Sequence, residues 1–472
     1  MVRNKQFNVE KFDYKEATII GLIMMFGTFV GSLAATLVSP ALPTIMEDFS
    51  ITPASGQWLT TVYMLVLGVM IPLTAYLVNR FTTRQLFITC VGVFSLGSAI
   101  ALTGHSFEVL LFARVLQAIG AGILLPLLQV TVLTIFPPEK RGFAMSIVGV
   151  TIGVAPAIGP TLSGYLVDAY GWHSLFLVTL VLGIIDLVAA VFFLRNIGKV
   201  GKGKFDLPSL IMSIVGFGGT LIGFSNIGNY GLTSANVIVP MIVGGITLYM
   251  FFRRQLVLDE PLLEVRVFKN RRFTISTILV SIVYGSMMSA TIIVPMYVQD
   301  IRGYSALTSG LLILPGAIIM LLFNPVAGKI LDKYGGRILF IVGMTLLLIG
   351  NLGFILLDES ISLLFLTIAY GFRMLGVSCL LMPLTAWGVK SIPVDYMSHA
   401  SALNTTLRQV SGAIGSAIFV SIMVKASTLG VYNSPIMNNI FGVEVSFMAV
   451  SVLSLIGLII TIIYGKDKKA GC

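Results

Sequence analysis

The stretch GVTIGVAPAIGPTLSG, from Gly149 to Gly164, lies near the middle of an apolar segment between Arg141 and Asp168. At helical spacing, small residues and prolines share one face: Gly149, Gly153, Pro156, Pro160 and Ser163. In lipid, helices associate by close backbone approach at small residues, and interior prolines free carbonyls and permit a bend. The stretch therefore predicts a membrane helix that packs tightly and flexes, with a plain packing face as the alternative.

The composition of the whole chain is that of a membrane protein. Of its 472 residues, 56% are hydrophobic and only 11% are charged, and the mean hydropathy is +0.97; soluble domains carry roughly 25% charged residues. A span needs about 20 apolar residues. Fourteen runs meet this length, at about 18–40, 58–78, 85–104, 109–134, 143–167, 174–194, 207–226, 236–252, 273–298, 305–328, 338–357, 361–387, 400–424 and 445–464.

The net charge of +10 is explained by topology. Of the 30 Lys and Arg residues, 25 fall at one set of span ends, and only Arg302 and Lys425 fall in the other loops. This split fits the positive-inside rule if the protein lies in the plasma membrane with both termini in the cytoplasm. The loop between Lys199 and Lys204 is then cytoplasmic and Asn229 outside. No nucleic-acid partner follows, and Cys and His spacing suggests no metal site.

An internal repeat divides the chain. PLTAYLVNRFTTR begins at Pro72 and PVAGKILDKYGGR begins at Pro325, an offset of 253. We therefore expect a cytoplasmic N-terminus over 1–17, a six-helix bundle over 18–195, a linker with two extra spans over 196–272, a second six-helix bundle over 273–464, and a cytoplasmic tail over 465–472.

The opening stretch carries a known family pattern. Written G-x3-G-x2-A-P-x2-G-P-x2-S-G, it resembles the antiporter motif in the fifth helix of drug:proton antiporters of the major facilitator superfamily. The resemblance implies a conformational role for six residues: Gly149, Gly153, Pro156, Gly159, Pro160 and Gly164.

The two repeat copies resemble the loop motif that joins the second and third helices of each major facilitator half. The second copy, around Asp332, follows G-x-L-x-D-R-x-G-R-R, whereas Ala75, Asn79 and Thr82 replace expected residues in the first. A gating role is implied for Asn79, Arg80, Arg84, Asp332 and Arg337.

Further motifs place the chain in one branch. Arg114 begins an R-x2-Q-x2-G-x-G pattern in the fourth span, and the segment from Leu407 to Gly415 resembles the thirteenth helix of the fourteen-span EmrB/QacA type. The resemblance implies an all-α major facilitator fold with a 6+2+6 layout. It also implies export of hydrophobic or amphipathic drugs by proton antiport, through a monomer that uses the proton gradient and no cofactor.

Polar residues within the spans are the substrate-binding candidates, because buried polar groups in lipid are costly. They are Thr36, Ser39, Tyr63, Gln117, Gln129, Asn324, Arg373, Asn404, Arg408 and Gln409, with Arg114 as a further buried charge. Arg114 and Arg408 lie close enough to span ends to snorkel to the interface. Arg373 is near the midplane, which favours a role in the central cavity.

The family's first helix carries an Asp in L-D-x-T-x-x-N-x-A-L-P. This chain reads LAATLVSPALP from Leu33 to Pro43, with Ala34 and Ser39 in place of the acid and the amide. Because Arg373 adds positive charge, a permanently cationic cargo is disfavoured. We expect neutral, zwitterionic or weakly basic amphipaths.

Proton antiport requires a group whose protonation alternates with cargo occupancy. Asp186 is the one acid near a midplane, so it is the first candidate, with Arg114 as a coupled charge. A sixth helix usually lies toward the outside of this fold, so hydrogen bonding to a neighbouring helix is the alternative for Asp186. Asp332 is the second candidate carrier.

Three other functions fit these residues to different degrees. An exporter or flippase of a single lipid or metabolite fits the same residues. A membrane-embedded enzyme would need paired carboxylates, a Ser/His arrangement or a metal cluster within the spans, and the sequence shows none, so we expect no enzyme. A channel would not need two repeated halves.

Overall fold

The computed structural model describes residues 14–464 apart from 52, 57, 138–139, 198–205, 232, 260, 305 and 359. Every regular element in this part of the chain is helical. The expected cytoplasmic loop at Lys199 to Lys204, residues 1–13 of the N-terminal tail and the whole C-terminal tail lie outside the described residues, as does the side chain of Asn229.

The first half contains six long helices: α1 (Tyr14–Leu37), α4 (Trp58–Arg80), α5 (Thr83–Thr103), α6 (Phe107–Ile135), α7 (Arg141–Tyr170) and α8 (His173–Phe193). Short helices η1 (Ser39–Ala41), α2 (Leu42–Asp48) and α3 (Pro53–Gly56) join α1 to α4. Trp172 donates its indole N–H to Asp48 Oδ2 at 2.7 Å, which ties this short-helix segment to the start of α8.

Two further helices, α9 (Leu207–Tyr230) and α10 (Ala235–Val257), precede the second half. After η3 (Val265–Lys269), the second half contains α11 (Arg271–Met296), α12 (Ala306–Tyr334), α13 (Gly336–Gly353), α14 (Leu363–Val389), α15 (Met397–Ser427) and α16 (Pro435–Tyr464). The short turns η4 (Tyr297–Ile301) and η5 (Val394–Tyr396) follow α11 and precede α15.

The number of spans agrees with the sequence. Thirteen described helices are long and apolar enough to cross a membrane, and α7 is a fourteenth when its two pieces are taken as one span. The pieces Arg141–Ala155 and Ile158–Tyr170 are bent by 41° relative to each other. The break falls where the sequence places Pro156, as expected for an interior proline. The predicted all-helical, fourteen-span fold is confirmed.

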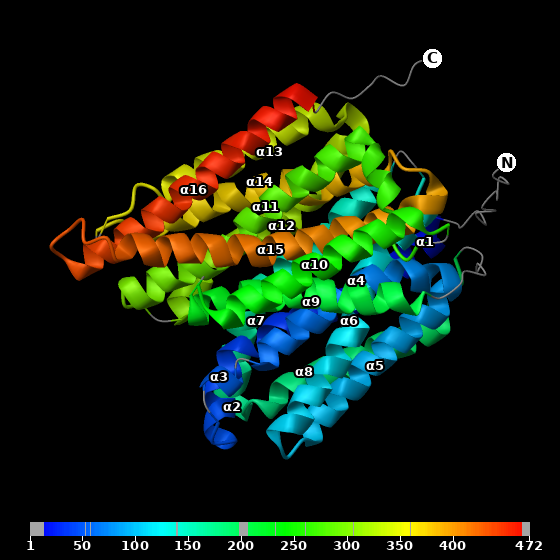
Figure 1. Ribbon diagram of the computed structural model, residues 1–472, viewed down its shortest axis with the longest axis horizontal. Helices are drawn as coiled ribbons and strands as arrows, with labels where there is room; N and C mark the ends of the chain where they lie inside the picture. The colour runs from blue at the N-terminus through cyan, green and yellow to red at the C-terminus, as the bar shows by residue number, and fades with distance from the viewer. Residues whose placement is uncertain are drawn as a thin grey trace.

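The two halves meet along two seams. Helix α7 packs along α12, and α4 packs against α15. The pair α9 and α10 lies beside α15 in Figure 1, and α9 contacts both α4 and α15. The extra helices therefore cover the α4–α15 seam and leave the α7–α12 seam uncovered by them.

The α9–α10 pair is held together by an ion pair and an amide. Arg254 donates from Nε and Nη2 to the two oxygens of Asp206 at 2.8 Å each, and these hydrogen bonds hold the pKa of Asp206 below its ordinary value. Gln255 Nε2 donates to Ser209 Oγ at 2.6 Å.

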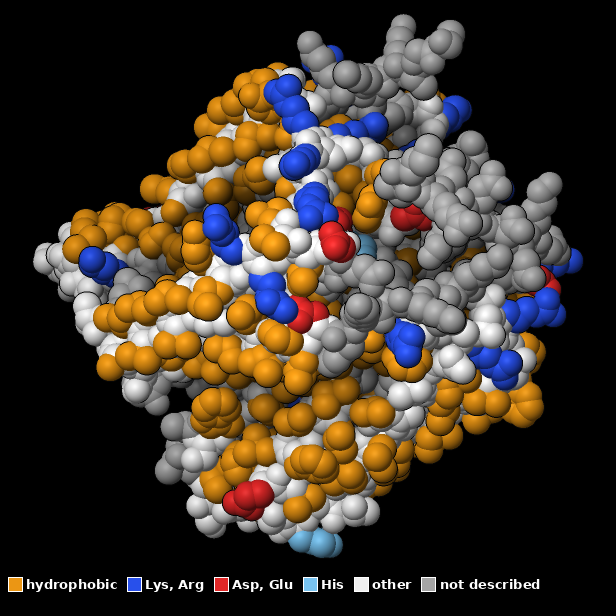
Figure 2. Space-filling model, turned by 45° about the vertical axis from the view of Figure 1, so that its right-hand side comes forward, with side chains coloured by type: hydrophobic (Ala, Val, Ile, Leu, Met, Phe, Trp, Pro, Cys, Tyr) orange, Lys and Arg blue, Asp and Glu red, His pale blue; other side chains and the backbone are white. Residues whose placement is uncertain are grey.

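The bundle has one strongly basic end, where α1 begins and where α4, α6, α8, α10, α12 and α14 end. Figure 2 shows Lys and Arg side chains gathered on the face that this end presents. We call it the basic end. Large apolar side chains cover the flanks, among them Phe192 at 76% exposed and Ile338 at 70%, as expected of helices that face lipid.

Candidate functional site

The small-residue face of α7 forms the α7–α12 seam only in its first part. A Cβ at Gly149 would lie 2.6 Å from Met382 Cγ and 3.2 Å from Asn324 Nδ2, and one at Gly153 would collide with Met320. Gly159 instead faces Thr36 of α1, and Ser163 donates to the Leu37 carbonyl at 2.6 Å. The face thus divides at the bend: its first part meets the second half and its last part meets α1.

At the basic end of this seam, Asp332 on α12 caps α7. Its Oδ1 accepts the backbone N–H of Gly142 at 2.9 Å and its Oδ2 accepts that of Phe143 at 2.8 Å. The first N–H groups of a helix have no partner within the helix, and its N-terminus favours negative charge. One carboxylate therefore satisfies two such groups across the boundary between the halves. We call this the Asp332 clamp.

The helix backbones touch beside this clamp. A Cβ at Gly328 would lie 2.5 Å from both the Gly142 carbonyl oxygen and Phe143 Cα. Lys329 places its Nζ 5.1 Å from the centre of the Phe143 ring. Because backbone atoms rather than flexible side-chain ends are in contact, Gly328 cannot carry a side chain while the seam is closed.

A second polar bridge joins the halves between α6 and α15. Ser401 and Thr405 donate their hydroxyl protons to Gln129 Oε1, at 2.8 Å and 3.0 Å. All three side chains are fully buried, and Gln129 Nε2 has no partner among the described residues. Ser401 lies one turn into α15, so this bridge is also near the basic end. We call it the Gln129 clamp; together the clamps close that end.

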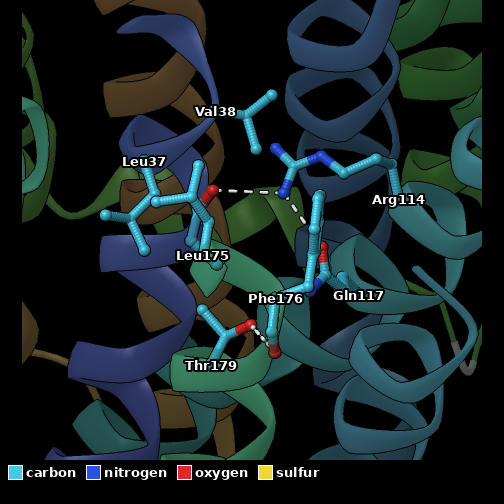
Figure 3. A pocket seen from close by; sticks show the side chains of 8 residues that line it. Leu37, Val38, Arg114, Gln117, Leu175, Phe176 and Thr179 are labelled. Atoms are coloured by element: carbon cyan, nitrogen blue, oxygen red, sulfur yellow. Dashed lines mark hydrogen bonds between the residues drawn. The ribbon is translucent and has the colours of Figure 1, made fainter. Parts of the chain in front are cut away.

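Arg114 lies inside the first half. From α6 it donates to the carbonyls of Leu59 and Ala34, each at 3.1 Å, and to Gln117 Oε1 at 2.9 Å. Its guanidinium stacks on Tyr63, 4.1 Å from the ring centre. Figure 3 shows this side chain reaching toward α1 beside a void, lined also by Leu37 and Phe176, that is too small for water.

The same network fixes two more candidate residues. Tyr63 donates its hydroxyl proton to the Gly31 carbonyl at 2.7 Å, and Gln117 Nε2 donates to Ser98 Oγ at 2.8 Å. These bonds join α1, α4, α5 and α6. Arg114, Tyr63 and Gln117 are therefore placed as ties within one half, and Arg114 does not snorkel.

Arg373 on α14 has the matching place in the second half. It donates from Nε to Asn351 Oδ1 at 2.5 Å and from Nη2 to the Ser286 carbonyl at 2.9 Å. Asn351 in turn donates to Ser454 Oγ at 2.9 Å. Each half therefore has a buried Arg on its fourth long helix that bonds a carbonyl on its first: Ala34 in one and Ser286 in the other.

Arg408 differs from both. It is 1% exposed, and neither Nε nor Nη1 has a hydrogen-bond partner among the described residues. Its guanidinium carbon lies 5.4 Å from the centre of the Tyr284 ring on α11.

Asp186 lies away from both seams. Its carboxylate is buried and points from α8 against α1, where a Cβ at Gly27 would collide with it; Phe87 of α5 lies at the same place. Neither carboxylate oxygen has a partner among the described residues. The expected alternative, a hydrogen bond to a neighbouring helix, is thus not seen in this part of the chain.

The first copy of the loop motif does not bridge the halves as the second does. Arg84 donates to the Val191 carbonyl of α8 at 2.6 Å, within its own half. Arg80 and Arg337 are exposed, and the side chain of Asn79 lies outside the described residues.

The other candidate residues are scattered. Thr36 donates to Leu33 beside Gly159, and Ser39 is exposed in η1. Asn324 is buried in the α7–α12 seam with Nδ2 unpartnered among the described residues. Asn404 bonds Thr277 and Thr385 at 3.3 Å each, within the second half. Gln409 is half-buried on α15.

The residues that bond Gln129 and Arg373 were not singled out from the sequence. Ser401, Thr405, Ser286 and Asn351 are all fully buried. Ser401, Thr405 and Arg408 follow helical spacing on α15, which is the signal that could have grouped them with Gln129.

Comparison with known proteins supports this architecture. The sequence pattern of the Major Facilitator Superfamily matches residues 24–416. The chain is 40% identical over 466 residues to the MFS-type transporter YcnB of Bacillus subtilis, covering 98% of each chain. It is 37% identical to the lincomycin resistance protein LmrB of the same organism, covering 94% of this chain and 95% of LmrB.

More distant relatives also match over most of the length of this chain. The probable multidrug resistance protein EmrY of Escherichia coli is 28% identical, over 87% of this chain and 81% of EmrY. Among solved structures, the human organic anion transporter MFSD10 superimposes with a TM-score of 0.65 at 16% identity, covering 94% of this chain and 99% of the other. At that identity the likeness shows the fold.

Proposed function

This chain belongs to the Major Facilitator Superfamily, a family of transporters, and on that premise we propose that it exports hydrophobic and amphipathic small molecules in exchange for protons. Transporters with two repeated bundles expose a site between the bundles to each side in turn. In the proposed orientation the basic end faces the cytoplasm, both termini are cytoplasmic, and the protein lies in the plasma membrane as a monomer.

The observation that carries this proposal is the pair of clamps at the basic end. The Asp332 clamp joins α12 to α7 and the Gln129 clamp joins α15 to α6, so each joins the first half to the second through a different pair of helices. Both consist of hydrogen bonds that separation of the halves would break. A state closed at the basic end, held by breakable polar contacts, is one of the two states that alternating access requires.

The cargo class is inferred from the relatives and from the interior charges. LmrB and EmrY are named for lincomycin resistance and multidrug resistance, which supports drug-like amphipaths as cargo. Three arginines are buried in the spans, and Ala34 stands where the family motif has an acid. Coulomb repulsion therefore disfavours a permanently cationic cargo.

Two acids are proposed for the proton. Asp332 fits coupling to the gate, because a protonated carboxyl would hold the α7 N-terminus less strongly than a carboxylate does. Asp186 fits storage of a proton within the membrane, because its buried carboxylate has no bonded oxygen among the described residues.

Drug susceptibility tests the proposal. Cells that express the protein should tolerate higher concentrations of several unrelated neutral or zwitterionic amphipaths than cells without it, and a protonophore should remove the difference. Unchanged tolerance to every compound at normal membrane abundance would reject drug export. Tolerance to a single compound would indicate a dedicated exporter instead.

A further inference from the structure

Charge is unbalanced inside this bundle. Arg114, Arg373 and Arg408 are each at most 1% exposed, whereas Asp186 is the one acid at most 1% exposed among the described residues. None of the three arginines forms an ion pair within the described part of the chain. A buried charge without a partner is strongly unfavourable, so each such arginine needs acceptors from somewhere.

Two of the arginines find those acceptors within their own half. Arg114 bonds two backbone carbonyls and Arg373 bonds one, and each also bonds a side-chain amide oxygen. Arg408 has no hydrogen bond among the described residues, and two of its donor nitrogens are fully buried. Arg408 is therefore the buried arginine whose acceptor is not supplied by the described part of the chain.

The position of Arg408 on α15 shows which way it faces. Ser401, Thr405 and Arg408 are spaced by four and three residues, so they share one helix face. Ser401 and Thr405 contact Gln129 of the first half, and Arg408 is one turn farther from the basic end on that face. Arg408 thus follows on the helix face whose earlier residues contact the first half, while its guanidinium lies over Tyr284 of α11 in its own half.

Its depth places it in the middle of the bundle. Arg408 is eleven positions after Met397, the first residue of α15. At about 1.5 Å per residue this is about 16 Å, roughly half of a 30 Å hydrocarbon core. Tyr284 of α11 lies beside it as an aromatic surface, with 8% of the residue exposed.

We propose that Arg408 and Tyr284 form the anchor for an acidic head group on the cargo, such as the carboxylate of an amphipathic acid or zwitterion. This rests on the proposed export function and narrows its substrate class. Guanidinium nitrogens bind a carboxylate in a bidentate, charge-assisted way. The apolar body of the cargo packs on the Tyr284 ring. The first half closes over the site when the Gln129 clamp forms.

A matched pair of probes tests this anchor without any proton gradient. The purified protein in detergent is titrated with dansylaminoundecanoic acid and with its methyl ester, which differ in one charge. The wild type should bind the acid at least tenfold more tightly than the ester. Arg408→Gln should weaken binding of the acid about tenfold and change binding of the ester less than twofold. Arg408→Lys should bind the acid with intermediate affinity, because lysine keeps the positive charge but lacks the paired nitrogens of the guanidinium.

Lys425→Gln is the control, because it removes an exposed positive charge from the same helix and should bind both probes as the wild type does. Equal affinity of the wild type for acid and ester would overturn the proposal even if no variant folds. So would an Arg408→Gln protein that keeps the wild-type preference or loses both probes equally. Because the assay measures binding alone, absence of proton exchange would reject the proposed antiport and leave this result intact.

Discussion

The carboxylate of Asp332 accepts the backbone N–H of Gly142 at 2.9 Å, across 190 residues of sequence and from one half of the molecule to the other. The second oxygen accepts the next N–H, so a single side chain caps the helix that carries the glycine- and proline-rich stretch. Any opening of the basic end along the α7–α12 seam must break this cap. It therefore links the loop motif of one half to the antiporter-like helix of the other.

Asp332→Asn should favour the state that is open at the basic end. The amide keeps one acceptor oxygen but loses the negative charge, and hydrogen bonds to charged groups contribute about 1.5–3 kcal/mol against about 1 kcal/mol for neutral ones. A difference of 1.4 kcal/mol changes a population tenfold. A cysteine at Ala400, which is fully buried on α15, should then react at least three times faster with a thiol reagent.

Asp168→Asn is the control for this change, since Asp168 is exposed near the other end of α7. When Asp168→Asn is combined with the cysteine at position 400, that cysteine should be labelled at the same rate as in the protein that carries the cysteine alone. If the cysteine at position 400 is labelled at that same rate in the Asp332→Asn protein, the Asp332 clamp does not hold the basic end closed.

Substitutions of glycine should separate the moving seam from the rest of the small-residue face. Gly153→Leu would collide with Met320 and should abolish export while the protein stays in the membrane. Gly328→Ala should be almost as harmful, because its methyl group meets backbone atoms. Gly164→Leu should export normally, since no heavy atom lies within 4 Å of a Cβ there. Wild-type export by Gly153→Leu would show that this seam does not move.

The three buried arginines should differ in their effect on stability. Arg114→Gln removes the donor to Gln117 Oε1, and Arg373→Gln removes the donor to Asn351 Oδ1. An unsatisfied buried polar group costs about 1–3 kcal/mol. Both variants should melt at lower temperature in detergent. Arg408→Gln removes a cation that has no partner among the described residues, so its melting temperature should stay equal or rise. Similar destabilisation by all three would mean that Arg408 is also a structural tie.

Thiol labelling of intact cells tests the orientation. Leu429 is 65% exposed between α15 and α16, and Val394 is 45% exposed between α14 and α15, at the basic end. In a protein without Cys472, an impermeant reagent should label a cysteine at 429 and leave one at 394 unmodified until the membrane is opened. The reverse pattern would place the basic end outside.

The sequence predicts the spans and the repeat well because both depend on hydropathy and on local pattern. The spans coincide with the observed helices to within a few residues at most ends, and the bend in α7 falls at Pro156. Partners of buried polar residues were harder to infer. Whether Arg373 bonds Ser286 or faces the other half depends on the rotation of α14 about its axis, which 3.6-residue spacing alone does not fix. The neighbours of the Asp186 carboxylate likewise depend on the rotation of α8 about its axis.

The two candidate proton carriers can be told apart in proteoliposomes. If Asp186 carries the proton, Asp186→Asn should eliminate proton movement driven by the cargo. Counterflow exchange of cargo, which needs no proton, should be spared. If Asp186→Asn instead keeps wild-type coupling and Asp332→Asn loses it, the proton is carried at the clamp.

Proton movement driven by cargo in the wild-type protein is the defining property of the proposed antiport. Purified protein is reconstituted into vesicles that contain a pH-sensitive dye, and a gradient of an amphipathic cargo is imposed in the absence of a pH gradient. Protons should move against the direction of the cargo, and an opposing pH gradient should reverse cargo flow. Cargo movement without proton movement, unaffected by a pH gradient, would contradict the proposed antiport.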